Sequence, residues 1–193
     1  MNPNHPIVKR VSEVISNFFN PIVSLLIYFF YYSYHNLDKK ELIDFLLPIL
    51  FIVIIPSTLW IIINVKTGRY TNMDVSNRKQ RHSLYIVLIS LLSFYLGYEY
   101  FVKNNVDYRL VYLTVLIILM QISNFFIKSS MHTSLNFFVA ALFFEVKPIF
   151  GFLWLILAVV IGITRIILKR HTVAEVISGA VIASVVSLIY LIL

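Results

Sequence analysis

Long apolar runs separated by short polar stretches make up most of the chain. A bilayer core requires about 20 mostly apolar residues in a helix. Runs of this kind predict membrane helices over residues 14–34, 43–63, 83–102, 110–127, 133–146, 148–168 and 173–193. We therefore predict an all-α fold, a polytopic transmembrane bundle of about seven helices. Six is the alternative, because Asn17, Asn20 and Pro21 interrupt the first run.

Two of these runs differ from a regular span. The fifth has only 14 residues, which give about 21 Å of helix. A helix this short is expected to begin inside protein or a wet cavity, where its backbone groups find partners. Pro48 and Pro56 predict a kink in the second run. No repeat or flexible linker divides the chain, so we predict a single integral membrane domain over residues 1–193.

Composition agrees with this interpretation. Hydrophobic residues make up 60% of the chain and charged residues only 13%, whereas a soluble domain has about a quarter charged residues. The absence of cysteine excludes disulfides and thiolate chemistry. The net charge of +7 favours anionic membrane lipids as partners, and we expect no nucleic-acid partner.

The longest polar loop, residues 64–82, carries five basic residues: Lys66, Arg69, Arg78, Lys79 and Arg81. Such a loop can bind anionic lipid head groups at the membrane surface, or it can hold one anion in a defined site. Arg78 and Arg81 would share a face of a helix that begins near Ser76, because residues three apart are neighbours on a helix.

A second polar cluster lies where the fifth run starts. Ser129, Ser130 and His132 stand there, and a helix N-terminus offers unpaired N–H groups to an anion. The alternative is a serine cap with an incidental histidine.

A third cluster lies between the last two runs. His171 and Glu175 are four residues apart, so on a helix the carboxylate can orient the imidazole as in a catalytic dyad. Arg165 ends the preceding run and can reach the same space. The alternative is an ordinary His/Glu pair on a helix surface, although ionisable groups at a membrane boundary favour function.

Alternation of seven helices across the membrane places all three clusters on one face. Cationic groups, two histidines and a helix N-terminus suit phosphoryl transfer. Asp74 is the only acid in the first loop, and no paired carboxylates have the spacing of a Mg²⁺ site. We therefore expect no metal and no cofactor.

These residues resemble the motifs of the type 2 phosphatidic acid phosphatase superfamily of membrane lipid phosphatases. Its third motif, S-R-x5-H-x3-D, is matched by Thr164, Arg165, His171 and Glu175, with Thr for Ser and Glu for Asp. Its second, P-S-G-H, is similar to residues 129–132, which keep Ser130 and His132. Its first, K-x6-R-P, is matched least, since Lys66 and Arg78 are 12 apart and no proline follows. The resemblance covers roughly residues 60–193, which would form the catalytic core.

The resemblance implies a role for each matched residue. His171 would be the nucleophile that forms a phosphohistidine, Glu175 would orient it, and His132 would protonate the leaving alcohol. The implied phosphate ligands are Lys66, Arg78, Arg165 and Ser130, and the residues themselves add Arg81 as a candidate.

The function implied is metal-independent hydrolysis of a membrane lipid phosphate or polyprenyl diphosphate in a multi-pass protein of a prokaryotic plasma membrane. One alternative is a catalytically silent relative that binds anionic lipid or scaffolds a partner. The other is a transporter or a lipid head-group transferase. The family resemblance favours a site on the outer side of the membrane and the basic loops favour the inner side, so orientation stays open, as does the oligomeric state.

Overall fold

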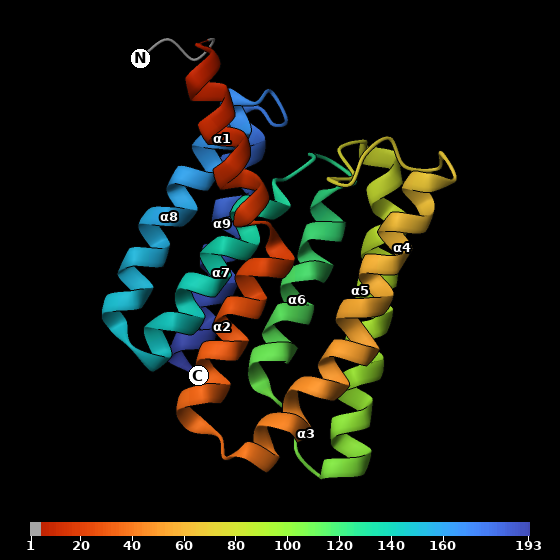
Figure 1. Cartoon of the computed structure of the whole chain (residues 1–193), viewed down its shortest axis with the longest axis vertical. Coiled ribbons are helices and arrows are strands. Elements are labelled where there is room, and N and C mark those ends of the chain that lie inside the picture. The colour runs from red at the N-terminus through yellow and green to blue at the C-terminus, as the bar shows by residue number, and fades with distance from the viewer. Residues whose placement is uncertain (1–4) are drawn as a thin grey trace. The chain divides into compact units, whose positions relative to one another are not determined.

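The computed structural model describes residues 5–193. Within this range the chain forms nine α-helices and two π-helical segments and contains no strand, which confirms the all-α prediction (Figure 1). Two compact units can be distinguished, one formed by Met1–Tyr32 with Ile127–Leu193 and the other by Ser33–Phe126. Each unit is described by itself.

Several helices of the described chain are long and apolar enough to cross a membrane. Four stretches meet this criterion: Lys39–Lys66, Arg78–Lys103, Pro148–Ile167 and Val173–Ile192. A fifth is added if the bent pair at the N-terminus counts as one span. The runs predicted at residues 110–127 and 133–146 form the shorter apolar helices α6 (Tyr108–Ser123) and α7 (Met131–Val146). The structure is therefore compatible with a membrane protein of four to five spans.

The first predicted run is divided into two helices. Helix α1 (Pro6–Phe18) and helix α2 (Pro21–Asn36) meet at an angle of 52°. The Asn20 side chain accepts hydrogen bonds from the backbone N–H groups of Ile22 and Val23, both at 3.1 Å. Asn20 therefore caps a new helix, and Pro21 occupies a first-turn position where its missing N–H costs nothing.

Helix α7 is the core of the first unit. It packs against α8 (Pro148–Ile167) and α9 (Val173–Ile192), which flank it in Figure 1. Its side chains are buried almost from end to end, including those of its first turn. This confirms the expectation that the short helix begins inside protein.

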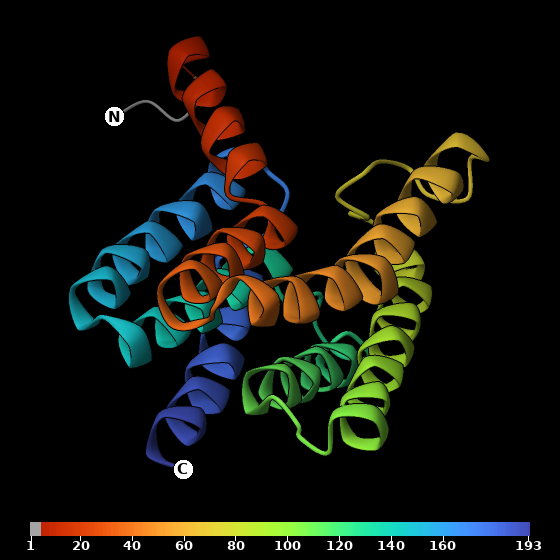
Figure 2. The same ribbon diagram turned by 60° about the horizontal axis from the view of Figure 1, so that its bottom comes forward.

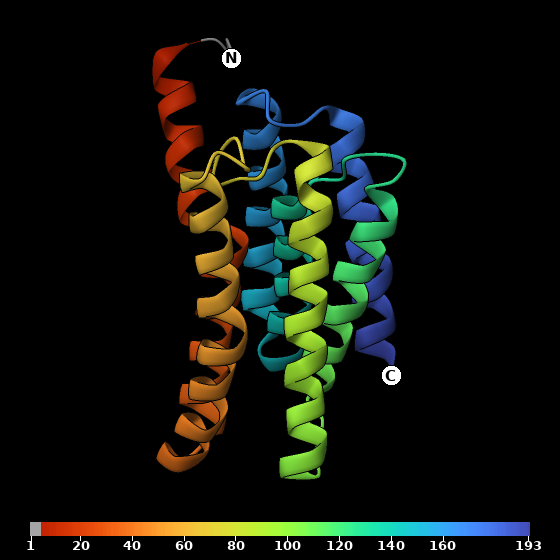
Figure 3. The same ribbon diagram turned by 90° about the vertical axis from the view of Figure 1, so that its right-hand side faces the viewer.

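The second unit is built on two long helical stretches. In the first, α3 (Lys39–Ile49) continues through the π-helical segment η1 (Leu50–Ile54) into α4 (Ile55–Lys66). In the second, α5 (Arg78–Tyr98) continues into the π-helical segment η2 (Glu99–Lys103). Helix α5 packs against α4, η1 and α6, as Figures 2 and 3 show for α4 and α6. Pro48 and Pro56 flank η1, and the stretch remains one candidate span.

Candidate functional site

The N-terminus of α9 places a carboxylate at a defined point. Thr172 is the N-cap, and its hydroxyl accepts a hydrogen bond from the Glu175 N–H at 3.3 Å. The Glu175 carboxylate in turn accepts from the Thr172 N–H at 3.1 Å. This reciprocal arrangement is a capping box, which the local sequence Thr-x-x-Glu favours by itself. Both Glu175 and the residue before the cap are thus held at the helix end.

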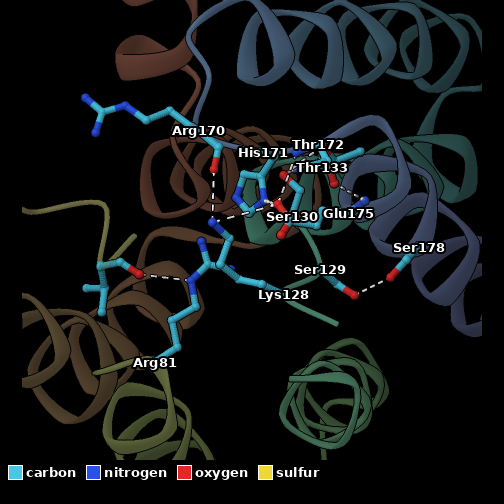
Figure 4. A network of polar contacts seen from close by, with 11 residues as sticks. Arg81, Lys128, Ser129, Ser130, Thr133, Arg170, His171, Thr172, Glu175 and Ser178 are labelled. Carbon is cyan, nitrogen blue, oxygen red and sulfur yellow. Dashed lines mark hydrogen bonds and ion pairs between the residues drawn. The ribbon is translucent and has the colours of Figure 1, made fainter. Parts of the chain in front are cut away.

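His171 is the residue before that cap, and its ring is directed at Glu175 (Figure 4). The distance between His171 Nδ1 and Glu175 Oε2 is 2.8 Å, which confirms the predicted pair. The His171 side chain is only 1% exposed, whereas that of Glu175 is 17% exposed. The pair therefore combines a buried imidazole with a carboxylate that retains some access to solvent.

Arg165 fixes the start of the loop that carries His171. Its backbone carbonyl accepts hydrogen bonds from the N–H groups of Arg170 at 3.0 Å and His171 at 3.2 Å. The side chain is buried in the last turn of α8, and its Nη1 donates to the Ser16 hydroxyl of α1 at 2.8 Å. Arg165 and His171 of the third motif are therefore joined by a backbone hydrogen bond, and Arg165 also bonds to α1.

The segment before α7 joins the same network. Lys128 Nζ donates to the Arg170 carbonyl at 3.2 Å and lies 3.8 Å from Glu175 Oε2 (Figure 4). One residue on, the hydroxyls of Ser129 and Ser178 are hydrogen-bonded to each other. Sequence reasoning did not select Lys128 as a site residue, because its partners lie more than 40 positions further along the chain. Its only local signal is that it directly precedes the Ser-Ser pair.

Ser130 and His132 begin α7. Ser130 is its N-cap, and the Ser130 hydroxyl accepts from the Thr133 hydroxyl at 3.0 Å and from the Thr133 N–H at 3.4 Å. Ser130 therefore acts as a helix cap, as the alternative interpretation of this cluster predicted. His132 is buried in the first helical turn.

The starts of α7 and α9 touch through their backbones. The Ser130 N–H donates to the Glu175 carbonyl at 2.9 Å. A Cβ at Gly179 would lie 2.7 Å from the Ser130 carbonyl oxygen, so only glycine permits this approach. The second and third motifs, about 40 residues apart in sequence, are thereby held side by side.

The basic residues predicted from the long loop belong to the second unit. Lys66 is exposed at the last position of α4. Arg78 begins α5 after the N-cap Asn77, close to the start expected near Ser76. Its guanidinium donates to the carbonyls of Asn124, at 2.7 Å, and Phe125. Arg78 therefore caps the C-terminal end of α6. Its role as a phosphate ligand, like that of Lys66, stays a prediction.

Arg81 has a different partner. Its buried side chain donates through Nε to the Val75 carbonyl at 2.9 Å, a bond drawn in Figure 4, and also interacts with Tyr85. Val75 is buried and has a φ of 45°, a conformation that β-branched residues rarely adopt. Arg81 therefore stabilises a strained loop. Its role as a phosphate ligand also stays a prediction.

Comparisons of the chain with known protein families, with characterised proteins and with solved structures find no match. The residues and their contacts are therefore the basis on which a function is proposed.

Proposed function

We propose that this protein is a metal-independent phosphatase that hydrolyses a membrane lipid phosphate or polyprenyl diphosphate through a phosphohistidine. The observation that carries the proposal is the hydrogen bond between the buried His171 ring and Glu175. A histidine held by a carboxylate at one nitrogen is the usual form of an activated imidazole.

The position of this pair favours a lipid substrate. His171 directly precedes α9 and follows α8, and both helices are candidate membrane spans. Large apolar side chains are exposed along them, among them Ile156 and Ile163 on α8 and Ile177 and Val181 on α9. If these helices cross the bilayer, a loop at their ends lies at the level of the lipid head groups. A phosphate carried by a lipid would meet the pair there.

In the first chemical step, Nδ1–H of His171 donates to Glu175, so the lone pair of the neutral ring lies on Nε2. Nε2 attacks phosphorus, the bond from phosphorus to the lipid oxygen breaks, and His132 gives its proton to that oxygen. The lipid leaves as an alcohol, or as a monophosphate if the substrate is a diphosphate. The phosphoryl group remains on His171.

In the second step, water attacks the phosphohistidine and His132, now neutral, accepts the proton. The N–P bond breaks, inorganic phosphate leaves, and His171 is restored. The positive charge of Arg165 offsets the charge that develops on the phosphoryl oxygens. The buried position of Arg165 strengthens that effect, because screening by water is weak there.

A second candidate function is anionic-lipid binding without turnover. The specific observation in its favour is that the same contacts have structural explanations. Glu175 completes a capping box, Ser130 caps α7, and Arg165 has Ser16 as a partner. These contacts would form in the folded protein even if it catalysed no reaction.

Phosphate release from a panel of lipid phosphates, measured in detergent with EDTA present, separates the two candidates. The panel contains phosphatidate, phosphatidylglycerophosphate, a lysolipid phosphate and a polyprenyl diphosphate. We expect turnover of at least one member, loss of that turnover in His171→Ala, and inhibition by orthovanadate, which mimics trigonal-bipyramidal phosphorus.

The matched control is His35→Ala, which removes an exposed histidine of the second unit and should leave turnover unchanged. Trapping with radiolabelled substrate should label the wild type and not His171→Ala. A wild-type protein that binds these lipids but releases no phosphate supports the binding candidate. Full activity in His171→Ala contradicts the assignment of the nucleophile.

A further inference from the structure

Helix α1 buries polar side chains and exposes apolar ones, the reverse of a helix on the surface of a soluble protein. Two serines, Ser12 and Ser16, are buried one turn apart on its inner face. Four large apolar side chains form a stripe on the exposed face, at intervals of four, three and four residues: Ile7, Val11, Val14 and Phe18. This spacing keeps them on one side of the helix.

The inner face of α1 contacts the candidate site. Helix α1 packs against α8, next to which it lies in Figure 1, and Ser16 accepts a hydrogen bond from the buried Arg165 guanidinium at 2.8 Å. The resemblance to lipid phosphatases covers only residues from about 60 onward, so it assigns no role to α1.

We propose that α1 is a lipid-contacting arm that holds Arg165 in position through Ser16. The occupant of the exposed stripe is the phospholipid interface. Two observations point to it. Arg10 is exposed and, at 100° per residue, lies beside the stripe, where it suits anionic head groups. Helix α8, against which α1 packs, is itself a candidate span with exposed apolar side chains.

The consequence is a link between the membrane surface and the anion site. Lipid contact holds α1 against α8, and α1 presents the Ser16 hydroxyl to Arg165. A guanidinium with a fixed partner loses less freedom when it binds an anion. Ser16 is thus a positioning residue, and this part of the inference rests on the proposed phosphatase function.

Lipid contact is tested with single-cysteine variants. The chain has no cysteine of its own, so only the introduced residue is labelled. Val14→Cys and the adjacent, charged-face control Glu13→Cys are labelled with bimane. Both are placed in phosphatidylglycerol–phosphatidylcholine vesicles whose acyl chains carry bromine. We expect bromine to quench the label at position 14 at least twice as strongly as the label at position 13. Equal quenching at both positions overturns the lipid-facing assignment.

Positioning is tested by inhibition with orthovanadate. We expect Ser16→Ala to raise the inhibition constant about tenfold, in line with loss of one hydrogen bond to a charged group, and Ser16→Thr to restore it. Ser12→Ala is the matched control from the same buried face and should have no effect. Equal effects of Ser16→Ala and Ser12→Ala overturn the positioning role.

The link itself is tested by adding one negative charge to either side of α1. Val11→Asp disrupts the stripe and should reproduce the effect of Ser16→Ala on vanadate inhibition, whereas Asn17→Asp, on an exposed position outside the stripe, should not. Equal effects of the two substitutions overturn the link.

Failure of the proposed function is distinguishable from failure of this inference. If the wild type releases no phosphate, the phosphatase proposal fails, and the contact is tested by thermal unfolding. The single variants Ser16→Ala and Arg165→Lys and their double variant then form a cycle. Additive shifts of the unfolding midpoint overturn the coupling between Ser16 and Arg165, and non-additive shifts support it.

Discussion

Both units have polar side chains at helix ends, but these side chains have different kinds of partner. In the first unit, two ionisable side chains bond to other side chains: His171 to Glu175, and Arg165 to Ser16. Lys128 lies 3.8 Å from Glu175 and also donates to the Arg170 carbonyl. In the second unit, Arg78 and Arg81 donate to backbone carbonyls, those of Asn124 and Phe125 and that of Val75.

This difference distinguishes side chains that can take part in a reaction from side chains that satisfy backbone carbonyls. A carbonyl at a helix end or in a loop needs a donor wherever water is scarce, and an arginine that supplies it is explained by folding alone. A carboxylate that holds one nitrogen of a buried imidazole also sets which nitrogen carries the lone pair. The first unit is therefore where we expect catalysis, whereas the bonds of Arg78 and Arg81 in the second unit are explained by folding.

The largest expected effect is that of Glu175→Gln. Glutamine retains the size of the side chain but cannot stabilise the imidazolium that forms in the reaction. We expect kcat for phosphate release to fall about a hundredfold or more, with little change in KM, since the dyad acts in the transition state. A rise in KM with unchanged kcat would mean that Glu175 is only structural.

Gly179→Ala tests the close backbone contact that joins α7 and α9. The added Cβ would lie 2.7 Å from a backbone oxygen of Ser130, which cannot move aside as a flexible side chain can. We expect the free energy of unfolding in detergent to fall by about 2 kcal/mol.

The matched control for that substitution is Gly97→Ala in α5. Nothing lies within 4 Å of a Cβ at Gly97, so alanine should stabilise that helix by about 0.5–1 kcal/mol. Equal changes in the two variants would contradict the close approach at Gly179.

Arg78→Gln tests the capping role in the second unit. It removes the guanidinium donor from the carbonyls at the end of α6, so we expect a loss of about 1 kcal/mol in unfolding free energy. Lys79→Gln, at the exposed neighbouring position, should change stability by less than about 0.5 kcal/mol. Weaker vanadate inhibition in Arg78→Gln alone would establish the ligand role that the sequence predicts.

The smallest expected effect is that of Lys128→Met. Methionine keeps the apolar stem but loses the ammonium that lies 3.8 Å from Glu175. A pair of this length is worth about 0.5 kcal/mol, so we expect kcat to fall two- to threefold and Lys128→Arg to restore most of it. Lys169→Met, at an exposed lysine nearby in sequence, should change nothing. An unchanged kcat in Lys128→Met would mean that Lys128 has only a structural role, through its bond with the Arg170 carbonyl.

Features set by local spacing were predictable from sequence. The His171–Glu175 pair, the Ser130 cap and the start of α5 after Asn77 all depend on residues at most four positions apart. Polar residues within apolar helices typically bond to neighbouring helices. Asn136 and Gln121 do so, with Asn136 bonded to Phe19 and Trp154, and Gln121 to His82.

Features set by tertiary contact were not predictable in the same way. The partner of Arg165 lies 149 residues away in sequence, and hydropathy carries no information about such a pair. The break after Phe18 lies where Asn20 and Pro21 interrupt the first run, but the apolar pattern did not predict that a helix extends back from there to Pro6. Arg78 and Arg81 both lie in the first turn of α5, but they have different partners. Arg78 donates to the Asn124 carbonyl and Arg81 to the Val75 carbonyl, which the charge pattern could not identify.

The π-helical segment η1 gives the stretch Lys39–Lys66 a place where one residue more or less can be absorbed. A π turn accommodates one more residue than an α turn does over the same advance. Removing one residue from Leu50–Ile54 would therefore restore regular α geometry there and leave the helix beyond it in its orientation. Trp60, whose indole donates to the Tyr70 hydroxyl at 2.9 Å, would keep its partner. In a regular α-helix such as α9, the same deletion rotates everything beyond it by about 100°. A one-residue deletion within η1 should therefore do less harm than one in the middle of α9.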